Sequence, residues 1–109
     1  MTEFAGSLRE RIIIERPVGV RTAMGLQQSS WEPVCRCLAA VVPEGAGPEA
    51  EAMALSAMPR FRVSIRKRDG IAIDQRVRWR GRALMVRQLF EDPRARDRIE
   101  LRCEEARGQ

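Results

Sequence analysis

The side chains that most often carry chemistry are scarce in this sequence. Cysteine occurs at positions 35, 37 and 103, and histidine is absent. A Cys-x-Cys pair with neither a second pair nor a histidine lacks the ligands that complete a tetrahedral metal site. If Cys35 and Cys37 lie on one strand, both thiols point to the same face, where a reduced cysteine packs as a small apolar group. We therefore expect buried structural cysteines, no metal and no cofactor.

Acid–base and nucleotide chemistry also lack their usual groups. Without histidine, the commonest general base is missing, and only rarer nucleophile–base pairs remain. The carboxylates mostly alternate with arginine, as in Arg9-Glu10-Arg11, and cross-strand charge pairs on a solvated face explain that pattern. Neither glycine-rich phosphate-binding motif is present. These absences predict a protein that is not an enzyme and has no catalytic residues.

The net charge of +5 rests almost wholly on arginine, because Lys67 is the only lysine. A guanidinium group suits phosphate and carboxylate equally well, so the charge fits either nucleic acid or an acidic neighbouring subunit. The arginines of the second half either pair with nearby acids on a solvated face or meet the acids of a neighbouring subunit. The subunit-interface candidates are Arg60, Arg62, Arg66, Arg76, Arg78, Arg80 and Arg82.

Two segments of the first half have strand character. Residues 8–16 contain three consecutive isoleucines between charged residues and end at Pro17, which predicts a strand. Residues 17–30 are polar and glycine-containing without an apolar period, which predicts a loop. Residues 31–42 are rich in apolar side chains and predict a second, largely buried strand. Its imperfect alternation leaves room for a bulge.

The second half alternates more strictly. Residues 60–66 place apolar and polar side chains on opposite faces, as in a half-buried antiparallel strand. Asp69-Gly70 is a tight-turn signal, after which the apolar alternation restarts at Ile71 and Ile73. Residues 76–80 and 83–90 predict a second hairpin with its turn at residues 80–82. Residues 98–104 predict the last strand.

The segment 44–58 differs from the rest of the chain. It is rich in alanine, carries three glutamates and has no basic residue, and it is either a long loop or a short helix. It serves either as a solvated connection or as a projection toward a ring axis or a neighbouring ring. The candidate lumen or interface residues are Glu44, Glu49, Glu51, Met53, Leu55 and Met58.

Together these elements predict a mainly β fold. We expect a small antiparallel β-barrel of about six strands, because closure removes the exposed edges of such a sheet. Residues 1–109 form one domain, with the long acidic, alanine-rich loop at 44–58. No apolar run approaches the length that spans a bilayer, and the first residues lack a secretory signal, so we expect assembly in the cytoplasm. The predicted core is Ile12, Ile14, Phe61, Val63, Ile65, Val77, Trp79, Ile99 and Leu101.

The order of several short motifs resembles the phage head-tail joining family, also called head-closure, stopper or head-tail adaptor proteins. The motifs begin with Gly6-Ser7-Leu8-Arg9-Glu10-Arg11-Ile12 and Pro17, and continue with Gly25, Trp31, Leu38-Ala39-Ala40-Val41 and Gly47-Pro48-Glu49. They end with Phe61-Arg62-Val63-Ser64-Ile65-Arg66, Ile73, Arg76-Val77-Arg78-Trp79-Arg80-Gly81-Arg82 and Leu101-Arg102-Cys103-Glu104-Glu105. The sequence departs from the family pattern at Leu38, where an aromatic residue is more usual, and at the Cys35–Cys37 pair.

This resemblance implies a structural subunit of a ring of six or twelve copies. The ring would lie in the neck of a virion or phage-like particle, between the portal or adaptor ring and the tail terminator or tail tube. Double-stranded DNA would pass through its channel, and no membrane is implied. The source would be a phage, a prophage or a gene-transfer particle.

Two other functions stay open from the residues alone. One is a small nucleic-acid-binding barrel whose arginine-rich face contacts phosphates. Tyrosine is absent, and Phe61 and Trp79 fall on the apolar face, which disfavours base stacking. The other is a different structural component of the tail.

Overall fold

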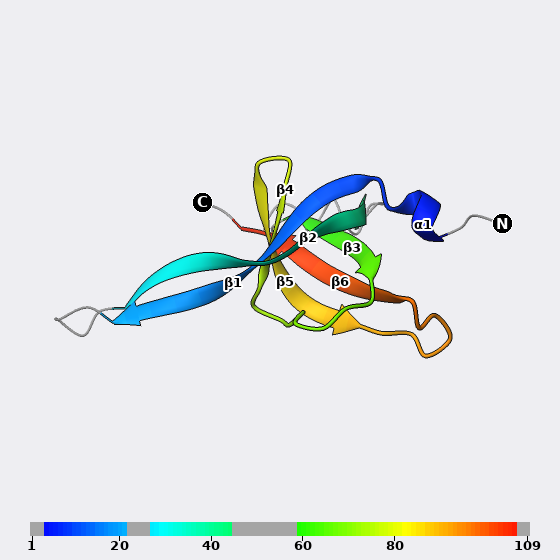
Figure 1. Cartoon of the computed structure of the whole chain (residues 1–109). Helices are drawn as coiled ribbons and strands as arrows, with labels where there is room; N and C mark the ends of the chain where they lie inside the picture. The colour runs from blue at the N-terminus through cyan, green and yellow to red at the C-terminus, as the bar shows by residue number, and fades with distance from the viewer. Residues whose placement is uncertain (1–3, 22–26, 45–58, 107–109) are drawn as a thin grey trace.

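The computed structural model describes residues 4–21, 27–44 and 59–106, and this part of the chain is almost entirely β. A short helix, α1 (Phe4–Ser7), precedes six antiparallel strands (Figure 1). The strands are β1 (Glu10–Arg21), β2 (Gln27–Pro43), β3 (Arg60–Arg66), β4 (Arg76–Trp79), β5 (Arg82–Phe90) and β6 (Arg98–Glu105). The mainly β prediction is therefore confirmed. The sequence did not predict α1, and residues 45–58, where a helix was considered, lie outside the described residues.

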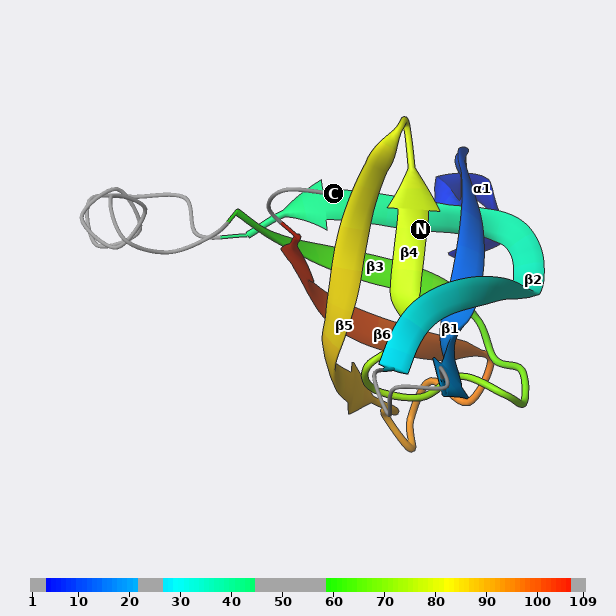
Figure 2. The same ribbon diagram turned by 90° about the vertical axis from the view of Figure 1, so that its left-hand side faces the viewer.

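The strands close into a barrel in the order β1-β2-β3-β6-β5-β4 (Figure 2). Closure is made by three pairs between β1 and β4, from Ile13 opposite Arg78 to Glu15 opposite Arg76. Each strand of the barrel thus has a partner on both sides, which leaves no open sheet edge around its wall. Among the described residues, no helix is long and apolar enough to cross a bilayer.

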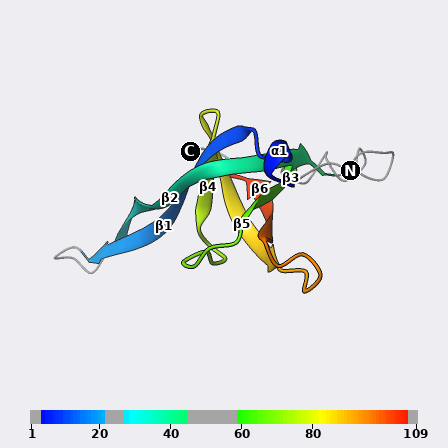
Figure 3. The ribbon, with the colours of Figure 1, turned by 45° about the vertical axis from the view of Figure 1, so that its right-hand side comes forward.

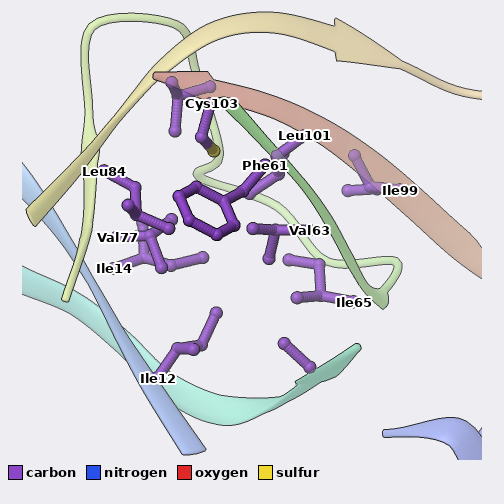
Figure 4. Close-up of a cluster of buried hydrophobic side chains, with 12 residues drawn as sticks. Ile12, Ile14, Phe61, Val63, Ile65, Val77, Leu84, Ile99, Leu101 and Cys103 are labelled. Carbon is purple, nitrogen blue, oxygen red and sulfur yellow. The ribbon is translucent and has the colours of Figure 1, made fainter. Parts of the chain in front are cut away.

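The barrel core is formed by the side chains that alternate inward along each strand (Figure 4). All the predicted core side chains except Trp79 are buried, and Trp79 is half-buried and packs against them. The buried cluster also contains Ala39, Leu84, Val86 and Cys103. Ile14, Val77 and Leu84 face one another across β1, β4 and β5, so one inward row links strands that are distant in sequence.

The β1–β2 hairpin is much longer than the sequence suggested. Its ladder continues to Arg21 opposite Gln27, and this ribbon projects beyond the barrel (Figures 1 and 3). The prediction of a strand end at Pro17 and a loop over 17–30 was therefore wrong for residues 17–21 and 27–30, and residues 22–26 lie outside the described residues. Among the described residues, no third strand pairs with β1 beyond Glu15, and a proline without an N–H is tolerated where one edge of a strand is unpaired. The predicted bulge is present, because the register shifts where Ile14 pairs with Cys35 and Glu15 with Pro33.

The turn at Asp69-Gly70 does not join a hairpin. Gly70 has a positive φ of 90°, but β3 pairs with β2 and β6, and the chain crosses to β4 through residues 67–75. The buried Gln75 side chain organises this crossing: its amide nitrogen donates to the Gly70 carbonyl at 2.7 Å, and its oxygen accepts from the Ala72 N–H at 3.0 Å. Ile73, expected to resume the alternation, is exposed.

The β4–β5 hairpin agrees with the prediction. Trp79 pairs with Arg82, and the two residues between them, Arg80 and Gly81, both have positive φ, at 50° and 77°. Two consecutive positive φ values are the signature of a type I′ turn, whose twist matches that of the flanking strands. This hairpin brings Arg80 and Arg82 to one end of the barrel.

Candidate functional site

The three cysteines lie in the barrel core or against it. All three are free thiols; Cys103 is buried, while Cys35 and Cys37 are half-buried against the core. Burial, and secondarily Cys35, raise the pKa of Cys37 to about 11, and burial raises the pKa of Cys103 to about 12. Such thiols stay protonated near neutral pH, and it is the thiolate that reacts and binds metals. No cluster of three or more metal-ligating side chains occurs among the described residues.

Trp79 caps one end of the barrel rather than lying inside it. Its ring meets Phe61 edge-to-face, with centroids 5.4 Å apart. The indole Nε1 donates a hydrogen bond to Glu10 at 2.8 Å, and Arg80 contacts the same carboxylate at 2.8 Å. The hydrogen bond from Trp79 is the largest cause that holds the pKa of Glu10 below its ordinary value, and Arg80 lowers this pKa further. Glu10 thus pairs with Arg80, which is distant in the sequence, and not with its neighbours Arg9 and Arg11.

Arg82 covers the same barrel end. Its guanidinium forms two bonds to Glu105, at 2.9 and 2.5 Å. It also lies 4.8 Å from the Phe61 ring centroid and 5.3 Å from that of Trp79. The bonds from Arg82 lower the pKa of Glu105, and Glu105 in turn raises the pKa of Arg82. We call Glu10, Trp79, Arg80, Arg82 and Glu105 the rim cluster.

Two further interface candidates pair within the chain. Arg76 contacts Glu15 at 2.6 Å and stacks over the Trp31 ring at 4.3 Å, which fastens the base of the β1–β2 ribbon to β4. Arg62 lies 3.5 Å from Glu100 on the neighbouring strand. For these two residues and for the two arginines of the rim cluster, the structure supplies acids that the sequence did not reveal, because the partners come from other strands.

Arg60, Arg66 and Arg78 differ from the other candidates. All three are exposed, and none forms an ion pair with an acid among the described residues. Five arginines outside the sequence-based candidates are similar, because they are also exposed and form no ion pair within residues 4–21, 27–44 and 59–106: Arg9, Arg11, Arg36, Arg87 and Arg96. The strand register distinguishes Arg36 among these residues, because it places Arg36 and Arg78 on either side of Ile13.

The acidic segment remains a prediction. Glu44 is described, and its carboxylate lies 3.7 Å from Arg102. The other candidate residues of that segment, Glu49, Glu51, Met53, Leu55 and Met58, lie outside the described residues.

The aromatic rings are mostly covered by the chain's own arginines. Arg76 stacks on Trp31, Arg82 on Phe61 and Trp79, and Arg98 on Phe4 at 3.9 Å. Base stacking needs a free ring face. Of the rings in the described part of the chain, Phe90 alone is strongly exposed. The surface therefore offers charge to an anionic partner but few platforms for bases.

The fold is a small, closed β-barrel. Most side-chain contacts on the surface of its described residues are made by arginines. The family model of the phage head completion proteins matches residues 5–106. The chain belongs to the phage head completion protein family. It is therefore a structural component of the phage head–tail type, which confirms the resemblance seen in the sequence motifs.

Solved structures that share the fold include the following two. One is the solution structure of protein SF1141 from Shigella flexneri 2a, at 28% identity and a TM-score of 0.71, covering 98% of this chain and 100% of that chain. The other is a chain in the virion of a native gene transfer agent particle, at 20% identity and a TM-score of 0.65, covering 91% of this chain and 96% of that chain. No curated protein matches the chain.

Proposed function

We propose that this protein is a head-closure subunit that assembles into a homo-oligomeric ring of six or twelve copies. The ring lies in the neck of a phage or phage-like particle, between the portal or adaptor ring and the tail terminator or tail tube. Double-stranded DNA passes through its channel. The family match over residues 5–106 carries this proposal, because it spans every strand of the barrel.

Two features of the molecule support assembly. A closed barrel resists open-ended pairing between sheet edges, so copies meet through side-chain surfaces that can specify a closed ring. The projecting β1–β2 ribbon, by contrast, has little of its own chain to pack against, and an isolated two-stranded hairpin is only marginally stable in water. A neighbouring copy that covers the ribbon would stabilise it.

The exposed arginines without an acid partner among the described residues favour an anionic neighbour. In a ring, each copy meets the same partner surface, so one complementary pair of patches repeats at every interface. The protein acts in this role by binding and positioning, and the proposal assigns it no catalytic step. The covered aromatic rings disfavour the alternative of a barrel that binds single-stranded nucleic acid.

Native mass spectrometry and negative-stain electron microscopy of the full-length protein test this proposal, alone and with its adaptor and tail partners. We expect rings of six or twelve copies with an axial opening. A strictly monomeric protein that joins neither neck partner, and that instead retards single-stranded nucleic acid, would overturn the head-closure function and favour the nucleic-acid-binding barrel.

A further inference from the structure

Three arginines gather on the outer face of β2, β1 and β4. Arg36 and Arg78 flank Ile13 from the two neighbouring strands, and Arg11 lies two residues before Ile13 on the same face of β1. Arg11 in turn pairs with Leu38. We call Arg11, Ile13, Arg36, Leu38 and Arg78 the basic patch. With strands about 4.8 Å apart, the backbones of Arg36 and Arg78 are about 10 Å from each other.

The acids closest to the basic patch in the ladder are already engaged. Glu10 binds Trp79 and Arg80, Glu15 binds Arg76, and Glu32 binds Arg16. The three arginines therefore place like charge on one face without an ion pair to any described acid. Like charges on a surface repel one another over roughly a Debye length, ~8 Å at physiological salt. An anionic partner would remove that repulsion.

The basic patch also has an apolar component. Leu38 is 49% exposed, and Val42, four residues further along the same face of β2, is 43% exposed. A phosphate backbone makes no apolar contact with Leu38 or Val42. A polypeptide that combines carboxylates with apolar groups can contact both the arginines and these apolar side chains. The mixed character thus favours a protein partner over DNA.

The sequence contains such a polypeptide. Residues 45–58 include Glu49 and Glu51, followed by Met53, Leu55 and Met58, and they contain no lysine or arginine. We propose that the basic patch binds the segment 45–58 of the adjacent copy. This inference rests on the proposed ring and specifies the contact that joins its subunits. Glu49 and Glu51 pair with Arg36 and Arg78, and the apolar side chains cover Ile13 and Leu38.

A neighbouring copy fits this role better than the same copy does. The segment begins after Glu44, whose N–H bonds the Arg60 carbonyl at 3.0 Å, so both of its ends start at the junction of β2 and β3. Arg36 lies eight positions before Glu44, about 26 Å back along β2. To reach it, the acids of the same copy would need a nearly fully extended chain, which carries a high entropic cost.

A charge swap in the full-length protein tests the contact. R36E/R78E and E49R/E51R should each raise the dissociation constant of the oligomer about tenfold or more, measured by sedimentation velocity and native mass spectrometry. Combining all four substitutions should restore assembly. R87E/R96E is the matched control, because it reverses two exposed arginines on β5 and the β5–β6 turn, and it should assemble like the unmodified protein.

Photo-crosslinking separates the two geometries and does not depend on charge. Benzoylphenylalanine at position 38, in a mixture of isotope-labelled and unlabelled protein, should give crosslinks to residues 45–58 that join one labelled and one unlabelled chain. Circular dichroism verifies that each variant is folded, and R36Q/R78Q, expected to weaken assembly in the same direction, replaces any reversal that fails this check.

Three results would overturn the inference while leaving the ring intact. They are unimpaired assembly of R36E/R78E, failure of the fourfold swap to restore assembly, and crosslinks confined to single chains. Normal assembly of R36E/R78E with loss of double-stranded DNA binding would assign the basic patch to phosphates instead. If the unmodified protein forms no oligomer, the proposed function itself fails and the contact fails with it.

Discussion

The rim cluster and the basic patch use the same residue type for opposite purposes. In the rim cluster, Arg82 binds Glu105 twice and covers the rings of Phe61 and Trp79. In the basic patch, Arg36 and Arg78 extend from the outer wall without an acid partner among the described residues. Arginines whose partners come from the same chain stabilise the barrel, and those without one are available to another molecule. Charge counts from sequence do not make this distinction.

The largest effect on stability should come from Trp79 of the rim cluster. Trp79→Ala removes the ring that packs on Phe61 and the donor to Glu10, and because Trp79 is only half-buried we expect the low end of such losses, about 3 kcal/mol in the free energy of unfolding. Urea unfolding followed by circular dichroism measures it. Leu38→Ala is the control at an exposed site and should change stability by less than about 0.5 kcal/mol. Equal losses in both variants would refute the proposed difference between rim and patch.

Arg82→Ala should have a smaller effect. It removes two bonds to Glu105 and the contact with two aromatic rings, all partly solvated, so we expect a loss of about 1 kcal/mol. Arg82→Lys keeps the charge but not the paired geometry, and should recover only part of that loss. Full recovery in the lysine variant, measured by the same unfolding experiment, would show that the fork geometry contributes nothing.

The rim cluster should also make stability depend on pH. The pKa values of Glu10 and Glu105 lie below the ordinary 4.5 in the folded chain, so both carboxylates stabilise it above that pH. This contribution is lost as the pH falls through the lowered values. We expect the melting temperature to fall more steeply below about pH 4.5 in the unmodified protein than in Glu10→Gln/Glu105→Gln. Parallel melting curves would mean that other acids govern the loss.

The smallest effect on stability is expected in the basic patch. Arg36→Ala/Arg78→Ala removes two exposed guanidinium groups that lack an acid partner in the described part of the chain, so the free energy of unfolding should change by less than about 0.5 kcal/mol. The same variant should weaken assembly, which separates the effect on folding from the effect on the contact. A loss of more than about 2 kcal/mol in the monomer would mean that these arginines serve the fold after all.

Strands with strict alternation were predictable from the sequence. The period of two in residues 60–66 and 98–104 identified β3 and β6 and their inward faces, because alternate side chains of a strand lie on opposite sides whatever the partner. The type I′ turn at Arg80-Gly81 was local as well. The ribbon strands over residues 17–21 and 27–30 were not predictable, since their strand character comes from pairing between β1 and β2 rather than from an apolar period.

The sequence by itself determined that the protein is mainly β, which side chains alternate, and which family its motifs resemble. Only the tertiary structure decided which arginines are paired, because Glu10, Glu15, Glu100 and Glu105 reach their partners across strands far apart in the chain. The order of the strands in the barrel also determined which arginines are paired, because it places β6 between β3 and β5 and β4 beside β1. Alternation is a property of one strand, whereas the register that brought Arg36, Ile13 and Arg78 into one row belongs to three.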